Sequence, residues 1–99
     1  TKNKDLSPTI YKENSNVENS LISNGCLIEG TVKNSVLSRG VIVKKGAVIK
    51  NSIIMQDSVI EEDASIDCAI LDKEVTVTKG KKLVGQKSYP AAIAKGSIV

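Results

Sequence analysis

The amino-acid sequence repeats itself, and this repeat restricts the fold more than any other feature. Three blocks begin with an Asn-Ser pair, at Asn19, Asn34 and Asn51, and a fourth related block begins at Cys68. Their lengths are 15, 17, 17 and 17 residues. A fixed period of this size is typical of solenoids, in which each turn of the chain buries its apolar side against its neighbours. The sequence therefore predicts a stack of similar circuits.

Each block contains a finer unit, in which a small residue or a valine precedes a large aliphatic residue by two positions. Side chains two apart on a strand share a face, so each unit predicts a short strand with two inward residues. The twelve pairs are Ser15/Val17, Ser20/Ile22, Cys26/Ile28, Gly30/Val32, Ser35/Leu37, Val41/Val43, Ala47/Ile49, Ser52/Ile54, Ser58/Ile60, Ala64/Ile66, Ala69/Leu71 and Val75/Val77.

The spacing of the large residues predicts a triangular prism. Through most of the chain the steps run 6, 6 and 5, so three strands and three corners complete a circuit of about 17 residues. Stacked circuits pair as parallel sheets and align the large residues in three columns. These columns are expected to be Ile28, Val43, Ile60 and Val77; Val17, Val32, Ile49, Ile66 and Leu83; and Ile22, Leu37, Ile54 and Leu71.

Turn residues and irregular ends complete the expected layout. The column of Asn19, Asn34 and Asn51 is expected at corners, because asparagine tolerates positive φ and satisfies turns locally. The step from Ile28 to Val32 is only four residues, which predicts one tightened corner. We expect residues 1–14 to lead into the coil as a linker, residues 15–84 to form the circuits, and residues 85–99 to form a loop and a closing partial circuit. Thr9 and Tyr11 have the spacing to begin the first circuit.

The composition excludes several classes of function. The chain has no histidine, so it cannot form a Ser-His-Asp or Cys-His catalytic site or a His-ligated zinc site. Cys26 and Cys68 lie in no Cys-x-x-Cys pair, and we expect ordinary reduced thiols and no metal site. The net charge is +3, but Tyr11 and Tyr89 are too few aromatics for base stacking, so no nucleic-acid partner is expected.

The hydropathy pattern gives an expectation about location. No apolar run approaches the roughly 20 residues that a membrane-spanning helix needs. The first five residues, Thr1 to Asp5, lack the apolar stretch of a signal peptide. We therefore expect a cytoplasmic protein that has no membrane partner.

Repeats of this hexapeptide-like kind resemble the single-stranded left-handed parallel β-helix, an all-β fold; the handedness is implied by the resemblance. The segments NSLISNGCLIEG, NSVLSRGVIVKKGAVIKNSIIMQ and AILDKEV, between about Asn19 and Val77, are similar to the carboxy-terminal domain of bacterial glucose-1-phosphate adenylyltransferase, or ADP-glucose pyrophosphorylase. Within that family, GCLIEGTVKNSVLSRGV and NSIIMQ resemble the second, regulatory subunit of the glycogen-synthesis enzyme more than the catalytic one.

The resemblance implies a structural, oligomerisation and regulatory domain rather than a catalytic one. In that family a separate nucleotidyltransferase domain uses ATP, with magnesium, and glucose 1-phosphate to form ADP-glucose and pyrophosphate for glycogen. This stretch has no Gly-rich phosphate loop and no carboxylate cluster placed for magnesium, so we expect no cofactor and no catalysis here. Two other hypotheses stay open: a hexapeptide-repeat acyltransferase with a catalytic residue other than histidine, and a stand-alone assembly scaffold.

The resemblance also implies that phosphorylated sugar effectors bind near the junctions of this domain, where cationic side chains are required. Arg39 is the only arginine and can hold a phosphate with two hydrogen bonds; Lys44, Lys45 and Lys50 follow it. These four residues are the candidate effector contacts. The alternative is that corner lysines keep the coil soluble and discourage pairing at sheet edges.

The implied partners are the protein's own catalytic domain and other subunits, in a homo- or hetero-oligomer that is a tetramer by family resemblance. The sequence contains more outward aliphatic residues than a fully solvated sheet favours. Ile42 and Val59 are 17 residues apart, as are Ile53 and Ile70, which predicts two apolar outward columns. The candidate interface residues are Ile42, Ile53, Met55, Val59 and Ile70. High β-propensity at exposed positions is the alternative explanation.

Overall fold

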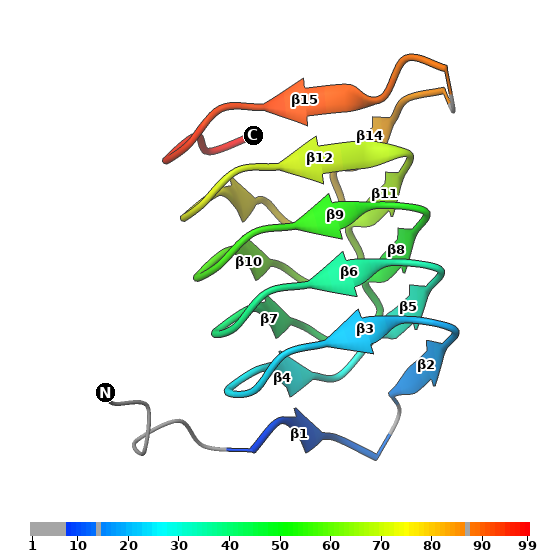
Figure 1. Ribbon diagram of the computed structural model, residues 1–99, viewed down its shortest axis with the longest axis vertical. Helices are drawn as coiled ribbons and strands as arrows, with labels where there is room; N and C mark the ends of the chain where they lie inside the picture. The colour runs from blue at the N-terminus through cyan, green and yellow to red at the C-terminus, as the bar shows by residue number, and fades with distance from the viewer. Residues whose placement is uncertain (1–7, 14, 87) are drawn as a thin grey trace.

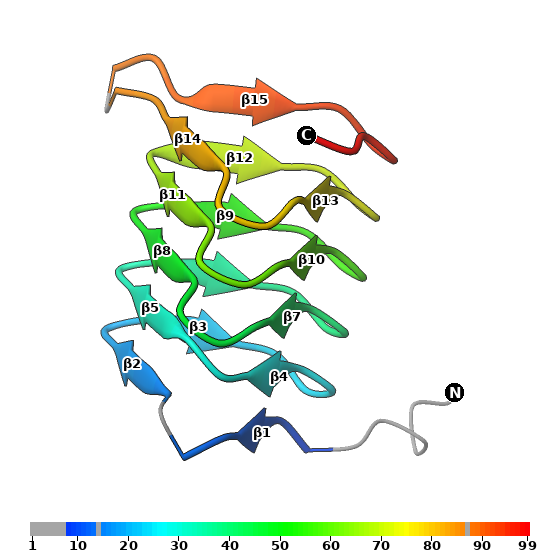
Figure 2. The same cartoon turned by 180° about the vertical axis from the view of Figure 1, so that it is seen from behind.

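The computed structural model describes residues 8–13, 15–86 and 88–99, and these residues form a coil of short strands without any helix. Fifteen strands alternate among three five-stranded parallel sheets, so every third strand joins the same sheet (Figure 1). The front strands of Figure 1 run from right to left as the chain rises, and Figure 2 shows the chain returning behind them. The coil is therefore a left-handed parallel β-helix, as predicted.

The three sheets form the three sides of the prism. Sheet A consists of β1 (Ile10–Tyr11), β4 (Leu27–Ile28), β7 (Ile42–Val43), β10 (Val59–Ile60) and β13 (Thr76–Val77). Sheet B consists of β2 (Asn16–Glu18), β5 (Thr31–Lys33), β8 (Val48–Lys50), β11 (Ser65–Asp67) and β14 (Lys82–Val84). Sheet C consists of β3 (Leu21–Ile22), β6 (Val36–Leu37), β9 (Ile53–Ile54), β12 (Ala69–Leu71) and β15 (Ala91–Ile93).

The register of the sheets confirms the three predicted columns of large residues. In sheet A, Val43 pairs with Ile28 on one side and Ile60 on the other. In sheet B, Ile66 pairs with Ile49 and with Leu83, and in sheet C the pairing of Leu37 with Ile54 continues to Leu71. Residues 17 apart therefore lie one strand apart through most of the molecule.

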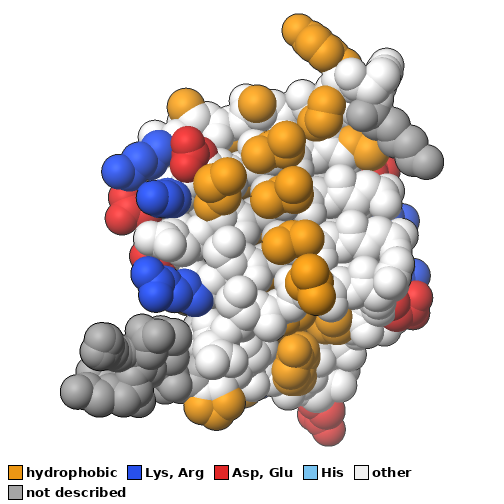
Figure 3. Space-filling view, in the orientation of Figure 1, with side chains coloured by type: hydrophobic (Ala, Val, Ile, Leu, Met, Phe, Trp, Pro, Cys, Tyr) orange, Lys and Arg blue, Asp and Glu red, His pale blue; other side chains and the backbone are white. Residues whose placement is uncertain are grey.

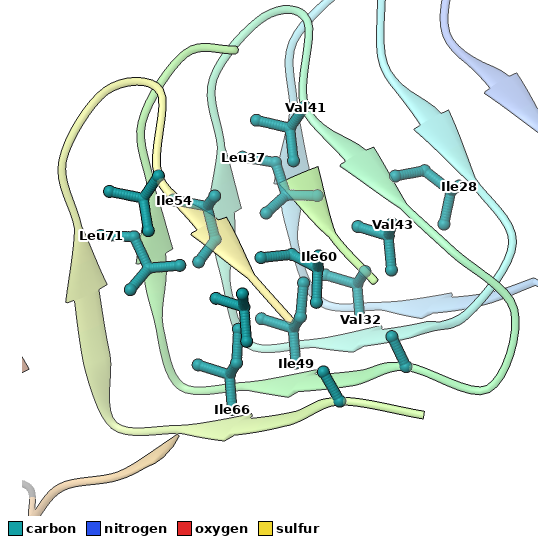
Figure 4. Close-up of a cluster of buried hydrophobic side chains, with 14 of the residues drawn as sticks. Ile28, Val32, Leu37, Val41, Val43, Ile49, Ile54, Ile60, Ile66 and Leu71 are labelled. Carbon is teal, nitrogen blue, oxygen red and sulfur yellow. The ribbon is translucent and has the colours of Figure 1, made fainter. Parts of the chain in front are cut away.

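The core is a thin aliphatic rod along the prism axis (Figure 4). Ten of the twelve predicted inward pairs, from Cys26/Ile28 to Val75/Val77, are buried at both positions. The first two pairs, Ser15/Val17 and Ser20/Ile22, are only half-buried because fewer circuits cover the amino-terminal end of the coil. Each large aliphatic side chain in the rod contributes about 1.5–3 kcal/mol by burial.

Residues in the left-handed backbone conformation close the corners. At the corner between sheets B and C, Asn19, Asn34 and Asn51 have φ of 48°, 51° and 50°, and Cys68 continues this column with φ 54°. Asparagine adopts this conformation more readily than most residues. The Asn19 amide also donates a hydrogen bond to Asn34 Oδ1 at 2.7 Å, so the predicted turn role of this column is confirmed.

The tightened corner depends on a glycine. Between Ile28 and Val32 the chain passes from sheet A to sheet B without the two-residue turn used one circuit later at Lys45 and Gly46. Gly30 is buried there, and a Cβ atom on it would collide with the carbonyl oxygen of Ala47. The backbone of the next circuit therefore approaches too closely for any side chain.

The two ends of the coil differ from its middle. Strand β1 pairs with β4 through Ile10–Leu27 and Tyr11–Ile28, so part of the leading segment already belongs to sheet A; residues 1–7 and 14 of that segment lie outside the described residues. At the other end, Gln86 and Tyr89 pair in a turn before β15. Ile98 then pairs with Thr76 and extends sheet A by one bridge.

Candidate functional site

The four candidate effector contacts lie at all three corners of the prism. Arg39 lies at the corner between sheets C and A, Lys44 and Lys45 lie between sheets A and B, and Lys50 ends β8 at the corner between sheets B and C. Residues that are neighbours along the chain are thus separated around the prism. The structure does not bring the four cations together as one binding site.

The charges are instead arranged by circuit, in bands that run around the prism. Residues 34–50 contain four basic residues and no acidic one, whereas residues 51–67 contain five acidic residues and no basic one. The acidic residues are Asp57, Glu61, Glu62, Asp63 and Asp67. Because residues 17 apart lie on neighbouring strands, the acidic circuit lies directly against the basic circuit.

This arrangement gives Lys44 and Lys50 each a carboxylate one strand away. Lys50 pairs with Asp67 in sheet B. The Lys44 N–H donates to the carbonyl of Ile60 at 2.9 Å, which sets Lys44 beside Glu61 on the outward side of sheet A. Opposite charges on neighbouring strands attract each other and weaken the field that a distant anion would feel. Lys44 and Lys50 are therefore poor candidates for a phosphate site.

Arg39 also has an acidic residue one strand away, because the Asp57 N–H donates to the Arg39 carbonyl oxygen at 3.1 Å, but its corner differs from those of the lysines in its lining. It lines a shallow concavity with Ser23, Asn24, Ser38 and Gln56, at the corner where sheet C turns into sheet A. All five side chains carry hydrogen-bond donors, and none of them is a carboxylate. A guanidinium surrounded by hydroxyl and amide donors is the chemistry that binds an oxyanion. Of the four candidates, Arg39 is the one that has such surroundings.

The candidate interface residues lie on two different faces. Ile42 and Val59 are neighbours on the outward side of sheet A, and both are half-buried. Ile53 and Ile70 are neighbours on the outward side of sheet C, where Met55 follows β9. Figure 3 shows the sheet C face, with hydrophobic side chains in a stripe along the prism. The predicted columns exist, and they belong to separate surfaces.

Corner serines are structural residues that the sequence pattern did not reveal. Ser35 Oγ donates to the carbonyl oxygen of Lys33 at 2.7 Å and accepts from the Ser52 N–H at 3.2 Å. One circuit later, Ser52 Oγ donates to the Lys50 carbonyl at 2.7 Å and accepts from the Ala69 N–H at 3.1 Å. Each hydroxyl thus joins two circuits where the regular ladder of backbone hydrogen bonds is interrupted.

The corner between sheets C and A uses the same device. Ser58 Oγ donates to the carbonyl of Asp72 at 3.1 Å and accepts from the Val75 N–H at 3.2 Å. At the lower end, the Thr9 hydroxyl accepts from the Cys26 N–H at 3.4 Å. Within the described part of the chain, no buried side-chain oxygen or nitrogen lacks a hydrogen-bond partner. In the sequence, the only sign of these hydrogen bonds between circuits was a serine at the small inward position of several units.

Cys26 is a thiol within the core and is not a reactive site. Its side chain is 2% exposed, and its Sγ donates to the carbonyl of Ser38 at 3.1 Å. Burial raises the pKa of the Cys26 thiol, and hydrogen bonds from Val41, Thr9 and Gly40 oppose this effect only in part. A buried thiol whose pKa is raised stays protonated and is a poor nucleophile.

The described residues also fail to provide a metal centre. Among residues 8–13, 15–86 and 88–99, no group of three or more histidine, cysteine or carboxylate side chains is placed to hold an ion. These residues therefore do not fit the magnesium that the family resemblance associates with catalysis. The same ranges contain no helix long and apolar enough to cross a membrane.

Comparison with known proteins gives a family and a set of relatives. The family described as GlmU-like, C-terminal hexapeptide matches residues 7–90. The chain is 47% identical over 98 residues to the glycogen biosynthesis protein GlgD of Bacillus subtilis (strain 168). The aligned region covers 99% of this chain and 29% of that protein. It is 58% identical over 45 residues to GlgD of Geobacillus stearothermophilus, and this aligned region covers 46% of this chain and 13% of that protein.

A further relative carries the name of an enzyme. The chain is 36% identical over 81 residues to the glucose-1-phosphate adenylyltransferase of Bacillus thuringiensis (strain Al Hakam), which covers 82% of this chain and 22% of that enzyme. The chain therefore spans less than a third of the length of these relatives. The sequence resemblance to the adenylyltransferase family is confirmed.

Proposed function

The chain belongs to the family of GlmU-like C-terminal hexapeptide domains, and from this premise we propose that it is the β-helix domain of a glucose-1-phosphate adenylyltransferase-type subunit in glycogen synthesis. The observation that carries the proposal is the 47% identity to a glycogen biosynthesis protein over 99% of the chain. The weaker similarity to an adenylyltransferase points to the same assembly.

In this proposal the domain supports catalysis and does not perform it. The sequence has no histidine, and the described residues hold no candidate metal site. Conversion of ATP and glucose 1-phosphate to ADP-glucose and pyrophosphate would then occur in another part of the parent protein or in a partner subunit. The greater identity to GlgD than to the adenylyltransferase favours a regulatory subunit.

The concavity at Arg39 supports a regulatory role through a phosphorylated sugar effector. Its donor-rich lining suits a phosphate together with sugar hydroxyls. In full-length protein assayed with its catalytic subunit, Arg39→Ala should raise the effector concentration for half-maximal response at least tenfold. Lys50→Ala is the matched control, because Lys50 lies beside Asp67, and it should leave that concentration unchanged. Equal effects of the two variants would refute the assignment to Arg39.

The apolar faces support the second part of the role, which is assembly with the parent's catalytic domain and with other subunits in the cytoplasm. Ile42 and Val59 on sheet A, and Ile53, Met55 and Ile70 on sheet C, are the proposed contacts. An uncovered sheet face with this many aliphatic side chains is more typical of an interface than of a solvated surface.

The test of the function is an assay of the full-length parent protein. ADP-glucose formation from ATP and glucose 1-phosphate is measured with the parent alone, with the catalytic subunit alone and with the two mixed. A regulatory subunit should be inactive alone and should raise the activity of the mixture above that of the catalytic subunit. Activity of the parent alone would mark a catalytic subunit. No activity and no effect on the mixture would overturn the proposal.

A further inference from the structure

The sequence contains one Asn-Gly pair, and the structure places it at the tip of an exposed corner. Of the seven asparagines, only Asn24 is followed by a glycine. Asn24 and Gly25 form the turn between β3 and β4, where Asn24 is exposed and Gly25 has φ 78°. A glycine in this position has no side chain to hinder the approach of its backbone nitrogen to the amide of the preceding asparagine.

This corner is held at its base and is free at its tip. The Thr9 hydroxyl donates to the carbonyl oxygen of Ser23 at 2.6 Å and accepts from the Cys26 N–H at 3.4 Å, so both sides of the turn are fixed. Among the residues that the structure describes, Asn24 and Gly25 make no hydrogen bond through backbone or side chain. None of the described residues therefore occupies the nitrogen of Gly25.

The equivalent corners of the later circuits are tied to one another. The Asp57 N–H donates to the Arg39 carbonyl oxygen at 3.1 Å, and the next two corners of this column continue the pattern. The hydrogen bond that would extend this ladder to the first corner, from Gly40 to the Asn24 carbonyl, is absent from the described part of the molecule. The first corner can therefore rotate about its backbone bonds without breaking a hydrogen bond of this kind.

The asparagines at the corner between sheets B and C are protected by comparison. The N–H that follows Asn34 donates to Ser20 Oγ at 3.0 Å, and the N–H that follows Asn51 donates to Ser35 Oγ at 3.2 Å. The side-chain amides of Asn34 and Asn51 are hydrogen-bonded as well. Attack of the next backbone nitrogen on either amide would first have to break these hydrogen bonds.

We propose that Asn24 is a site of deamidation, which converts its side-chain amide to a carboxylate. The Gly25 nitrogen attacks Asn24 Cγ to form a cyclic imide, and ammonia leaves with the proton that the Gly25 nitrogen carried. A water molecule from the solvent then opens the ring at one of its two carbonyl carbons, which gives aspartate or isoaspartate. The net reaction consumes one water, releases one ammonia and needs no oxidant, metal or enzyme.

The product adds a negative charge to the concavity at Arg39. Asn24 lines this concavity with Ser23, Ser38, Arg39 and Gln56. The amide of Asn24 can donate a hydrogen bond to an anion, whereas a carboxylate only accepts and pairs with the guanidinium instead. Deamidation should therefore weaken anion binding at this corner. This consequence rests on the phosphate site proposed above, and the modification itself does not.

The modification is tested on the 99-residue chain, incubated at physiological pH and temperature. Peptide mass spectrometry then locates each asparagine that has become an acid. Asn24 should react about tenfold or more faster than Asn34 and Asn51, because reaction at these two sites first breaks a hydrogen bond. In guanidinium chloride this advantage should decrease, since unfolding releases the two protected sites.

Asn24→Gln is the matched control for the modification. Glutamine keeps the amide, but its longer side chain forms a cyclic imide with the next nitrogen far less readily, so this position should stay unmodified. An Asn24 that stays unmodified in the folded wild type, or that reacts no faster than Asn34 and Asn51, would overturn the proposal.

The consequence is tested by titration with inorganic phosphate, followed by NMR of the Arg39 side chain. Arg39 is the only arginine, so its guanidinium signal is unambiguous. Asn24→Asp should raise the phosphate concentration for a half-maximal shift about threefold or more relative to Asn24→Gln. Equal midpoints for the two variants would contradict the effect on anion binding. A wild type whose Arg39 signal does not respond to phosphate would refute the phosphate site of the proposed function, while the mass measurement would still decide the modification.

Discussion

At the scale of single residues, the corners depend on hydroxyl groups that act as bridges between circuits. Ser52 accepts a hydrogen bond from the buried N–H of Ala69, and its own proton goes to the carbonyl of Lys50. A methyl group in its place would leave the Ala69 N–H without an acceptor. An unsatisfied buried donor usually costs more than the hydrogen bond itself contributes.

Ser52→Ala should therefore lower the free energy of unfolding by about 1–3 kcal/mol, measured by urea denaturation. Ser65→Ala is the control, because Ser65 is an outward residue of β11, and it should stay within about 0.5 kcal/mol of the wild type. Equal losses in the two variants would contradict the bridging role of the corner serines.

The buried thiol of Cys26 predicts a change in stability at alkaline pH. Its pKa in the folded chain is raised above the ordinary value of 9.0 by burial. Above about pH 9 the unfolded chain loses this proton while the folded chain keeps it, so the free energy of unfolding falls as the pH rises. Below that pH the effect is absent.

The comparison of wild type with Cys26→Ala isolates this effect from the titration of lysines and tyrosines. The free energy of unfolding of the wild type minus that of the variant should be constant around neutral pH and should decrease above about pH 9. Denaturation curves at several pH values provide the measurement. Parallel pH profiles for both proteins up to strongly alkaline pH would rule out the proposed linkage.

The inward or outward direction of each residue followed from the sequence, and the hydrogen bonds at the corners did not. A period of two fixes the direction of Cβ, so Ile66 was predictably inside. Whether Ser52 merely fits its small position or also bonds to the next circuit depends on the distance between corners. That distance is set by the stacking and is not encoded in the local pattern.

At the scale of strands, the charge bands support one register over others. Along sheet A the outward residues Lys12, Glu29, Lys44 and Glu61 alternate in sign on successive strands. Opposite charges on neighbouring strands contribute about 0.2–1 kcal/mol per pair, and like charges oppose pairing. The alternation therefore favours the observed stacking of circuits.

Reversal of one charge tests this column. Lys44→Glu would place three glutamates on consecutive strands and should lower stability by about 0.5–2 kcal/mol, with a smaller loss at high salt. Combining it with Glu61→Lys re-forms an opposite pair and should recover part of the loss. Thermal denaturation at low and high salt measures both effects. A loss that salt does not change would show that the charges do not act on each other.

The same stacking explains why the sequence alone does not show which residues surround Arg39. Arg39, Lys44, Lys45 and Lys50 are close in the sequence, but each corner turns the chain by a third of a circuit. The true neighbours of Arg39 at its corner include Asn24 and Gln56, which lie 15 and 17 residues away. A sequence pattern can predict which residues are at corners, whereas the composition of one corner becomes clear only after the circuits are aligned.

At the scale of the whole molecule, the prism presents three faces of different chemistry around one core. Sheet C is nearly uncharged, sheet A combines an aliphatic column with alternating charges, and sheet B is mostly polar. A coil of this kind is a rigid spacer whose faces point in three fixed directions. Such a shape is suited to hold subunits in a defined arrangement, which is the role proposed for the parent protein.

The most direct test asks whether the function of the parent protein depends on the folded core of the prism. Full-length protein with Ile66→Asp, which puts a carboxylate in the core, is compared with Ser65→Asp, which puts it on the outward side of β11. The stimulation of the catalytic subunit in the mixed assay is the readout. We expect Ile66→Asp to abolish the stimulation and Ser65→Asp to preserve it. Full stimulation by the Ile66→Asp protein would contradict the claim that this folded domain carries the role.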